Sequence, residues 1–379
     1  MKVLLVQLAS MGDCLLVTPI ARQIKEVDYP GCHLTWMIGK QYGKILLNNP
    51  YVDEIKEMLC GRDDRGKIPL LIASLKQHYD KIIITDFFKE NYQHFYGTTR
   101  SALLRTYGKE IMVPVEPLVY LSAKEVKHVA SFASKHRLND LDLYPILVEY
   151  SPQSRQSDLD FEMAKRVARK VSHKYPRARF IFSSNEKIAD VPDNIIDASD
   201  LSWRENAELT KYCKLLLGGS SGITWLNTSN WAAKIPMLQF VRSEYMWGVL
   251  SPSVELDFMY WGLPTSQLIE ITNGHEDQLV DCLCEIIGKS FAVAKKSYPG
   301  REHLSKIEID NFFTRRLAQA FFSLPTIDPL YESVAATVAD EMAAKQAVVL
   351  GKVKYLVKSN YYAYKYIKKL KALLVKNIL

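Results

Sequence analysis

Short apolar runs alternate with stretches of helical pattern along the first part of the chain. The runs that predict buried strands lie at Lys2–Gln7, His33–Ile38, Tyr51–Glu57 and Lys81–Thr85. Helices are predicted over Leu15 to about Val27, with Pro19 near the first turn, over Gln41–Leu47 and over Pro69–His78. Strands that alternate with helices are typical of a parallel sheet covered on both faces.

The same pattern restarts after a connector. Val113–Leu121 contains two prolines and predicts an irregular link, and Ala123–His136 predicts a helix after it. Further strands are predicted at Pro145–Tyr150, Ala178–Ser183, Lys214–Leu217 and Pro236–Val241. Helices are predicted between them, at Phe161–Lys174, Trp203–Tyr212 and Ile223–Asn230. We therefore expect two Rossmann-like α/β domains, over residues 1–140 and 141–325, that face a central cleft where a ligand would bind.

Composition and charge narrow the function classes. The chain has 379 residues, of which 48% are hydrophobic and 24% charged, as in a folded protein large enough for two domains. Its net charge is +7, but Lys345–Leu379 holds nine lysines and no acidic residue, so the rest carries −2. A near-neutral body argues against a nucleic-acid enzyme, whose working cleft would be basic.

Cysteine usage and hydropathy bear on the compartment. The six cysteines form no paired metal-site spacing, which fits a reducing compartment. No apolar run approaches the roughly 18–20 residues that span a bilayer. The N-terminus looks superficially like a signal peptide, but Asp13 interrupts its apolar stretch. We therefore expect a cytoplasmic protein.

The first candidate site is the loop Ser10-Met11-Gly12-Asp13, which lies between a predicted strand and a predicted helix. Such a turn places backbone N–H groups at the rim of a cleft, and the helix dipole stabilises Asp13 as an anion. An ionised carboxylate there can take a proton from an attacking hydroxyl group. The alternative is that Asp13 is only a helix N-cap, a position that favours aspartate.

The second candidate site is the run Gly218-Gly219-Ser220-Ser221-Gly222, which follows the apolar strand. Its glycines let the backbone approach a ligand closely, and N–H groups at a helix start can hold a diphosphate. The side chains of Ser220, Ser221 and Thr224 add hydroxyl donors. The alternative is an ordinary turn with a serine cap.

The opening segment, from Ser10, Gly12 and Asp13 through Thr18 and Pro19 to Asn49–Glu54, resembles glycosyltransferase family 9, the lipopolysaccharide heptosyltransferase family. The resemblance implies a GT-B fold and inverting, metal-independent sugar transfer from a nucleotide-sugar donor. It also implies that Asp13 is the general base, which deprotonates the acceptor hydroxyl for attack on the anomeric carbon.

The resemblance continues at the second site, with two departures. Aligned on Gly222 and Leu226, the family's aspartate falls on Ser220 and its histidine falls on Trp225. Both changes leave open which nucleotide sugar is the donor and whether activity is kept.

The resemblance also places other donor-binding residues. The family's glycine/serine-rich loop corresponds to the segment that includes Ser154, and its lysine position falls on Ser157. Arg155 is close enough to supply the positive charge for a phosphate, unless it is an ordinary surface arginine. The resemblance implies that Glu186 lies near the nucleotide ribose and that Leu201 lines the nucleobase pocket. The simpler interpretations are that Glu186 only starts a helix and that Leu201 is an ordinary core residue.

Residues 326–379 predict a helical, basic appendage. Its lysines fall on one arc of a helix, with apolar residues opposite and tyrosines in the middle, as in helices that lie in a membrane interface. The lysines on this arc are Lys354, Lys358, Lys365, Lys368, Lys369, Lys371 and Lys376. A helix packed on the body is the alternative, and nucleic-acid binding ranks third.

These observations together predict a glycosyltransferase at the inner face of the cytoplasmic membrane. Its partners would be a nucleotide sugar and a lipid-linked or oligosaccharide acceptor such as a lipopolysaccharide core, with no cofactor and no metal. One alternative is a non-catalytic GT-B-like scaffold, suggested by Ser220 and Trp225. A nicotinamide-dependent enzyme is disfavoured, because no G-x-G-x-x-G follows the first strand.

Overall fold

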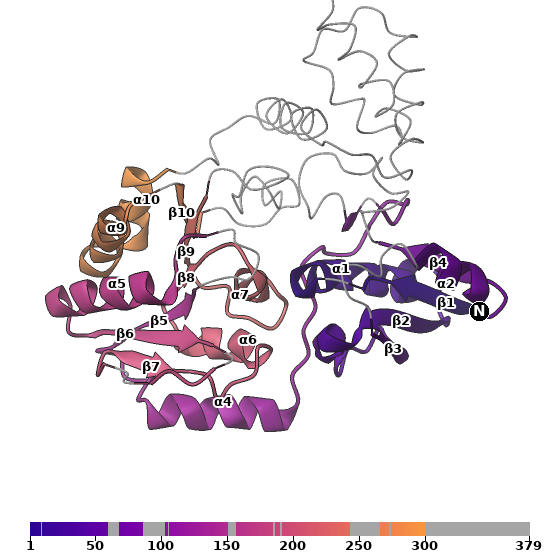
Figure 1. Ribbon diagram of the computed structural model, residues 1–379, viewed down its shortest axis with the longest axis horizontal. Coiled ribbons are helices and arrows are strands. Elements are labelled where there is room, and N and C mark those ends of the chain that lie inside the picture. Colours follow the sequence, from indigo (N-terminus) through magenta and orange to yellow (C-terminus); the bar gives the residue numbers. More distant parts are fainter. Residues whose placement is uncertain are drawn as a thin grey trace, which may run out of the picture.

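The computed structural model describes residues 1–8, 10–59, 68–85, 103–104, 106–150, 157–184, 186–189, 192–242, 266–272 and 274–299. It has two parallel sheets with helices around them, one in each half of the chain (Figure 1). The predicted α/β fold with two parallel sheets is thereby confirmed, whereas the predicted appendage lies outside the described residues.

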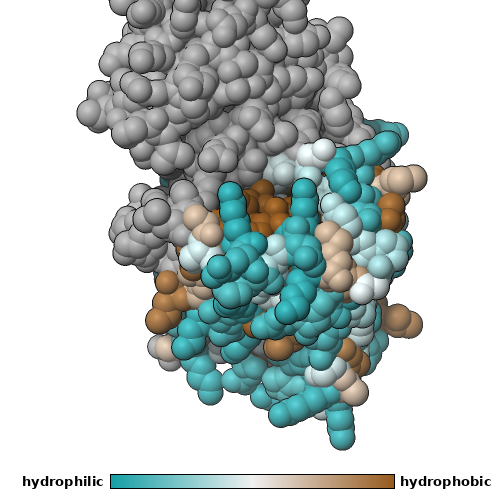
Figure 2. All heavy atoms as spheres, turned by 90° about the vertical axis from the view of Figure 1, so that its right-hand side faces the viewer, coloured by the Kyte–Doolittle hydropathy of each residue, from teal (hydrophilic) through white to brown (hydrophobic). Residues whose placement is uncertain are grey.

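The first domain contains a four-stranded parallel sheet in the order β3-β2-β1-β4. Its strands are β1 (Lys2–Val6), β2 (His33–Gly39), β3 (Glu54–Met58) and β4 (Lys81–Ile84). Its helical segments are α1 (Met11–Gln23), the π-helix η1 (Ile24–Asp28), the 3-10 helix η2 (Lys40–Leu46) and α2 (Ile68–Leu75). Residues Val3–Val6 of β1 are fully buried, because this strand lies between two others and is covered on both faces. The face that looks away from the second domain is mainly hydrophilic (Figure 2).

The second domain contains a six-stranded sheet in the order β10-β9-β8-β5-β6-β7. Its strands are β5 (Tyr144–Glu149), β6 (Ala178–Ser183), β7 (Ile195–Asp197), β8 (Leu215–Gly218), β9 (Met237–Val241) and β10 (Leu268–Thr272). Its helical segments are α5 (Phe161–Lys174), α6 (Glu205–Leu209), the 3-10 helix η5 (Thr210–Tyr212), α7 (Gly222–Asn227), α9 (Glu276–Gly288) and α10 (Phe291–Ser297). The central strands β5 and β8 are adjacent, so the residues that follow them are brought together.

The connector is bonded to both domains. The backbone N–H of Leu118 donates to Thr18 Oγ1 in α1 at 2.7 Å, and that of Val119 donates to Asn230 Oδ1 after α7, also at 2.7 Å. The connector leads into α4 (Ala123–Lys135), which lies along the second domain and packs against α6 (Figure 1). One buried apolar cluster includes side chains of both sheets.

The start of α1 differs from the prediction. The helix begins at Met11 rather than Leu15, because Ser10 adopts the extended backbone of an N-cap residue. Pro19 consequently lies in the helix interior, where it cannot donate to the carbonyl of Leu15. The Thr18 hydroxyl donates to that carbonyl instead, at 2.7 Å, which explains how the helix tolerates the proline.

Other predicted elements differ in extent. The strand expected at Tyr51–Glu57 begins at Glu54, and the helix expected at Gln41–Leu47 is the 3-10 helix η2. The helix expected at Trp203–Tyr212 is divided into α6 and η5. None of the helices in the described part of the chain combines the length and the apolar character that a membrane span requires.

Candidate active site

The Asp13 turn joins β1 to α1. Ser10 is the N-cap residue and Asp13 is the third residue of the helix. Asp13 Oδ2 accepts hydrogen bonds from the Ser10 backbone N–H at 3.0 Å and from the Ser10 hydroxyl at 3.1 Å. The carboxylate is therefore a partner of the cap rather than the cap itself, and its side chain stays partly exposed. Met11 and Gly12, also predicted here, form the first positions of the helix and are partly exposed as well.

The second turn joins β8 to α7, and a carboxylate from a neighbouring strand occupies it. Glu149 ends β5 and is 4% exposed. Its Oε1 accepts from the Ser221 hydroxyl at 2.5 Å and from the Ile223 backbone N–H at 2.8 Å. Its Oε2 lies 3.0 Å from the Thr224 hydroxyl. The helix start that we predicted to hold a diphosphate thus already holds an anion of the protein.

Gln239 of β9 completes this turn. Its Oε1 accepts from the Ser220 backbone N–H at 2.7 Å and lies 3.0 Å from the Thr224 hydroxyl. Ser220 itself has a φ of 59°, in the left-handed region that costs a residue with a Cβ atom free energy. Among the described residues, Ser220 Oγ and Gln239 Nε2 are buried and have no hydrogen-bond partner.

Glycines allow this close packing. A Cβ atom at Gly218 would lie 2.9 Å from Gln239 Nε2 and 3.0 Å from Glu149 Oε2. A Cβ atom at Gly222 would lie 2.9 Å from the indole nitrogen of Trp203. Side chains packed around the turn therefore leave little room for a Cβ atom at Gly218 and at Gly222.

The two turns meet at the domain interface, where α1 and α7 are in contact (Figure 1). Trp225 of α7, which is 5% exposed, lies beside the Asp13 turn. A Cβ atom at Gly12 would lie 3.6 Å from Trp225 Cδ1, an ordinary van der Waals distance. Trp225, onto which the sequence resemblance places the family's histidine, thus lies beside the turn that carries the predicted base.

The other predicted donor residues are dispersed. Glu186 is exposed after β6, and its backbone N–H donates to Ser184 Oγ at 3.0 Å. Leu201 is 5% exposed within the apolar core, which leaves little of its surface for a nucleobase. Ser154 and Arg155 lie outside the described residues, as do the seven lysines of the appendage.

Sequence reasoning missed the part that Glu149 plays in the second turn. The available signal was an acidic residue at the carboxyl end of the apolar strand Ile146–Val148, beside the strand that leads into the glycine-rich turn. A charge at the end of a buried parallel strand needs a partner, and the helix start supplies it.

Comparisons with solved structures define the fold. A family 9 glycosyltransferase from Veillonella parvula DSM 2008 superposes with a TM-score of 0.51 at 15% identity, covering 76% of this chain and 89% of that chain. The chain has the fold of a family 9 glycosyltransferase.

Two further glycosyltransferases of this fold, both from E. coli, are similar with lower scores. The ADP-heptose lipopolysaccharide heptosyltransferase II gives a TM-score of 0.49 at 13% identity, covering 74% of this chain and 97% of that chain. A heptosyltransferase solved with ADP gives 0.48 at 13% identity, covering 77% and 99%. No protein-family profile and no curated protein sequence matches the chain.

Proposed function

We propose that this chain is a glycosyltransferase that moves a sugar from a nucleotide-sugar donor to an envelope glycan, such as a lipopolysaccharide core. The observation that carries the proposal is the contact between the Asp13 turn and α7 at the interface of two domains with this fold. This contact places the turn that carries a partly exposed carboxylate of one domain beside the helix that follows the glycine-rich turn of the other.

In the proposed reaction, Asp13 takes the proton of an acceptor hydroxyl. The acceptor oxygen forms a bond to the anomeric carbon as the bond from that carbon to the diphosphate breaks. The electron pair leaves with the nucleoside diphosphate, and a single displacement inverts the anomeric centre. N–H and hydroxyl groups of the Ser220–Thr224 turn would stabilise the departing charge without a metal.

Glu149 constrains this proposal. The hydroxyl groups of Ser221 and Thr224 would have to turn from Glu149 toward the donor, because each hydroxyl has one proton to donate. The same observation favours a second candidate, a non-catalytic GT-B-like scaffold in which the turn has become structural.

A thermal-shift screen against ADP-, UDP-, GDP- and CMP-sugars tests the proposal. We expect one nucleotide sugar to raise the melting temperature of the wild-type protein, because binding to the folded state stabilises it. Ser221→Ala should lose most of that rise. Ser131→Ala is the matched control, since it removes an exposed hydroxyl that donates to a carbonyl within α4. If no nucleotide sugar shifts a well-folded sample, the scaffold candidate takes the lead.

We also propose that the basic appendage holds the protein on the inner face of the cytoplasmic membrane, where a lipid-linked acceptor would be met. The charge pattern of Lys345–Leu379 supports this. The full chain should sediment with anionic vesicles and remain in solution with neutral ones. Replacement of Lys354, Lys365 and Lys368 by glutamine should weaken the sedimentation. Equal sedimentation of the wild-type chain and of the lysine-to-glutamine variant with anionic vesicles would contradict the proposal.

A further inference from the structure

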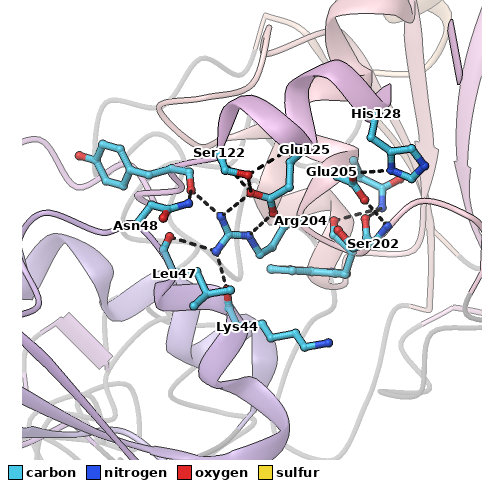
Figure 3. Close-up of polar contacts among 12 residues, drawn as sticks. Lys44, Leu47, Asn48, Ser122, Glu125, His128, Ser202, Arg204 and Glu205 are labelled. Atoms are coloured by element: carbon cyan, nitrogen blue, oxygen red, sulfur yellow. Dashed lines mark hydrogen bonds and ion pairs between the residues drawn. The ribbon is translucent and has the colours of Figure 1, made fainter. Parts of the chain in front are cut away.

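A buried arginine crosses the domain interface (Figure 3). Arg204 directly precedes α6 and is 3% exposed. Its Nη1 donates to the carbonyl oxygens of Lys44 at 2.6 Å and Leu47 at 3.0 Å, both at the end of η2 in the first domain. Its Nη2 donates to the carbonyl of Tyr120 in the connector. The guanidinium therefore binds the first domain and the connector from the second domain.

Glu125 of α4 balances the charge of this arginine. Arg204 Nε lies 3.1 Å from Glu125 Oε1. Burial lowers the pKa of the Arg204 guanidinium from its ordinary value, and the Glu125 carboxylate opposes that shift. A buried charge requires partners that compensate for lost hydration, so the set of contacts favours one arrangement of the domains.

A second carboxylate attaches α4 to the second domain. Glu205 Oε1 lies 2.7 Å from His128 Nδ1 of α4, and Glu205 Oε2 accepts from the Ser202 backbone N–H at 2.6 Å. The helix α4 and the start of α6 thus form one unit. The hydrogen bonds from Arg204 to the end of η2 connect this unit to the first domain.

The start of η2 is linked through a backbone contact to the segment that precedes the Asp13 turn. Gly39, which ends β2 and directly precedes η2, donates its N–H to the carbonyl of Leu8 at 3.2 Å. A Cβ atom at Gly39 would lie 2.5 Å from that carbonyl oxygen, so the two backbones touch. Leu8 lies two residues before Ser10, where the Asp13 turn begins. Arg204 thus binds the end of η2, the chain of η2 leads back to Gly39, and Gly39 bonds Leu8 just before this turn.

We propose that Arg204 is a positioning residue, a clamp that holds the two domains in the arrangement in which Asp13 faces the glycine-rich turn. Its effect on catalysis rests on the proposed function, whereas its effect on domain arrangement does not. Lysine at this position would keep one positive charge but could not serve three carbonyl groups and a carboxylate with a planar fork of donors.

Hydrogen exchange and kinetics of Arg204→Lys test the clamp. Exchange is followed at the N–H groups of Leu118 and Val119, which donate to one domain each. We expect exchange of at least one of these two N–H groups to become at least about 10-fold faster. When the two domains separate, the connector cannot keep its hydrogen bonds to both of them. We expect kcat to fall about 100-fold while the KM for the nucleotide sugar changes little, since misplacement of the base affects the chemical step.

The matched control is Arg166→Lys, which changes a half-exposed arginine of α5 whose ion pair to Glu276 stays within the second domain. The proposal is overturned if the N–H groups of Leu118 and Val119 exchange at the same rate in Arg204→Lys as in Arg166→Lys. If Arg204→Lys does not fold, Glu125→Gln replaces it and should give smaller changes of the same sign. Wild-type exchange in that variant would also overturn the clamp. The exchange result needs no nucleotide, so it decides the clamp even if no donor is turned over.

Discussion

The turn at Ser10–Asp13 and the turn at Gly219–Thr224 are each hydrogen-bonded to a carboxylate, but the two carboxylates come from different parts of the chain. Each turn follows a buried strand and leads into a helix whose N-cap is a serine with extended backbone, Ser10 or Ser221. Asp13 belongs to the helix whose start it bonds, three residues after the N-cap Ser10. Glu149 comes from a neighbouring strand and lies 72 residues before Ser221 in sequence.

This difference separates a candidate base from a structural anion. Asp13 is partly exposed at the domain interface, so an acceptor hydroxyl can approach it. Glu149 is buried and has three donors within 3.0 Å, from Ser221, Ile223 and Thr224. A carboxylate that is buried and already bonded by three donors stabilises a helix start but has little capacity to take a substrate proton.

The largest expected effect comes from Asp13→Asn. The amide oxygen can still accept from the Ser10 N–H, so stability should change by less than about 1 kcal/mol. Loss of the base should slow sugar transfer by about 100- to 10,000-fold. Release of nucleoside diphosphate in the presence of acceptor measures this, with donor binding checked by thermal shift. Unchanged release would exclude Asp13 as the base.

Glu149→Gln should lower the free energy of unfolding by about 2–3 kcal/mol. Both oxygens of Glu149 accept hydrogen bonds, and the NH2 group of a glutamine would replace one of them with a donor that faces other donors. Urea unfolding measures the change. Glu186→Gln is the control, since that side chain is exposed and should change stability by less than about 0.5 kcal/mol. Equal effects of the two substitutions would show that Glu149 does not hold the turn.

Ser220→Asp introduces the aspartate that the sequence resemblance expects at this position. Alone it should destabilise the protein, because it adds a second carboxylate to the buried turn that Glu149 already occupies. In the Glu149→Gln background the penalty should shrink, with a coupling of about 1–3 kcal/mol in a double-mutant cycle. Additive effects would mean that the two positions do not share one anion site.

The smallest expected effect is a gain of stability by Ser220→Gly of about 1 kcal/mol, because glycine adopts a φ of 59° without strain. It also removes a buried hydroxyl that has no partner among the described residues. Ser221→Gly is the matched control and should destabilise, since it removes the hydroxyl bonded to Glu149. Both are measured by urea unfolding.

The sequence predicted strands better than helix ends. Apolar runs located most described strands within one or two residues, because parallel strands buried on both faces are continuously hydrophobic. The start of α1 was missed because the cap of Ser10 extends the helix beyond its apolar face. The strands β7 and β10 and the helices α9 and α10 were not among the predicted elements.

Contacts distant in sequence account for what was missed in the site. The two glycine-containing turns were found from local patterns, but Glu149 reaches its partners only through the pairing of β5 with β8. Arg204 gave no signal, since its partners Lys44, Leu47 and Tyr120 contribute backbone carbonyls, which carry no residue pattern. Both residues depend on the tertiary arrangement.

The two turns are proposed to form one site, and a crystal structure of the protein with its bound nucleotide sugar tests this most directly. We expect the diphosphate within hydrogen-bond distance of Ser221 or Thr224, and the anomeric carbon on the side that faces Asp13. A diphosphate bound away from the Gly219–Thr224 turn, or a sugar directed away from Asp13, would contradict the proposed site.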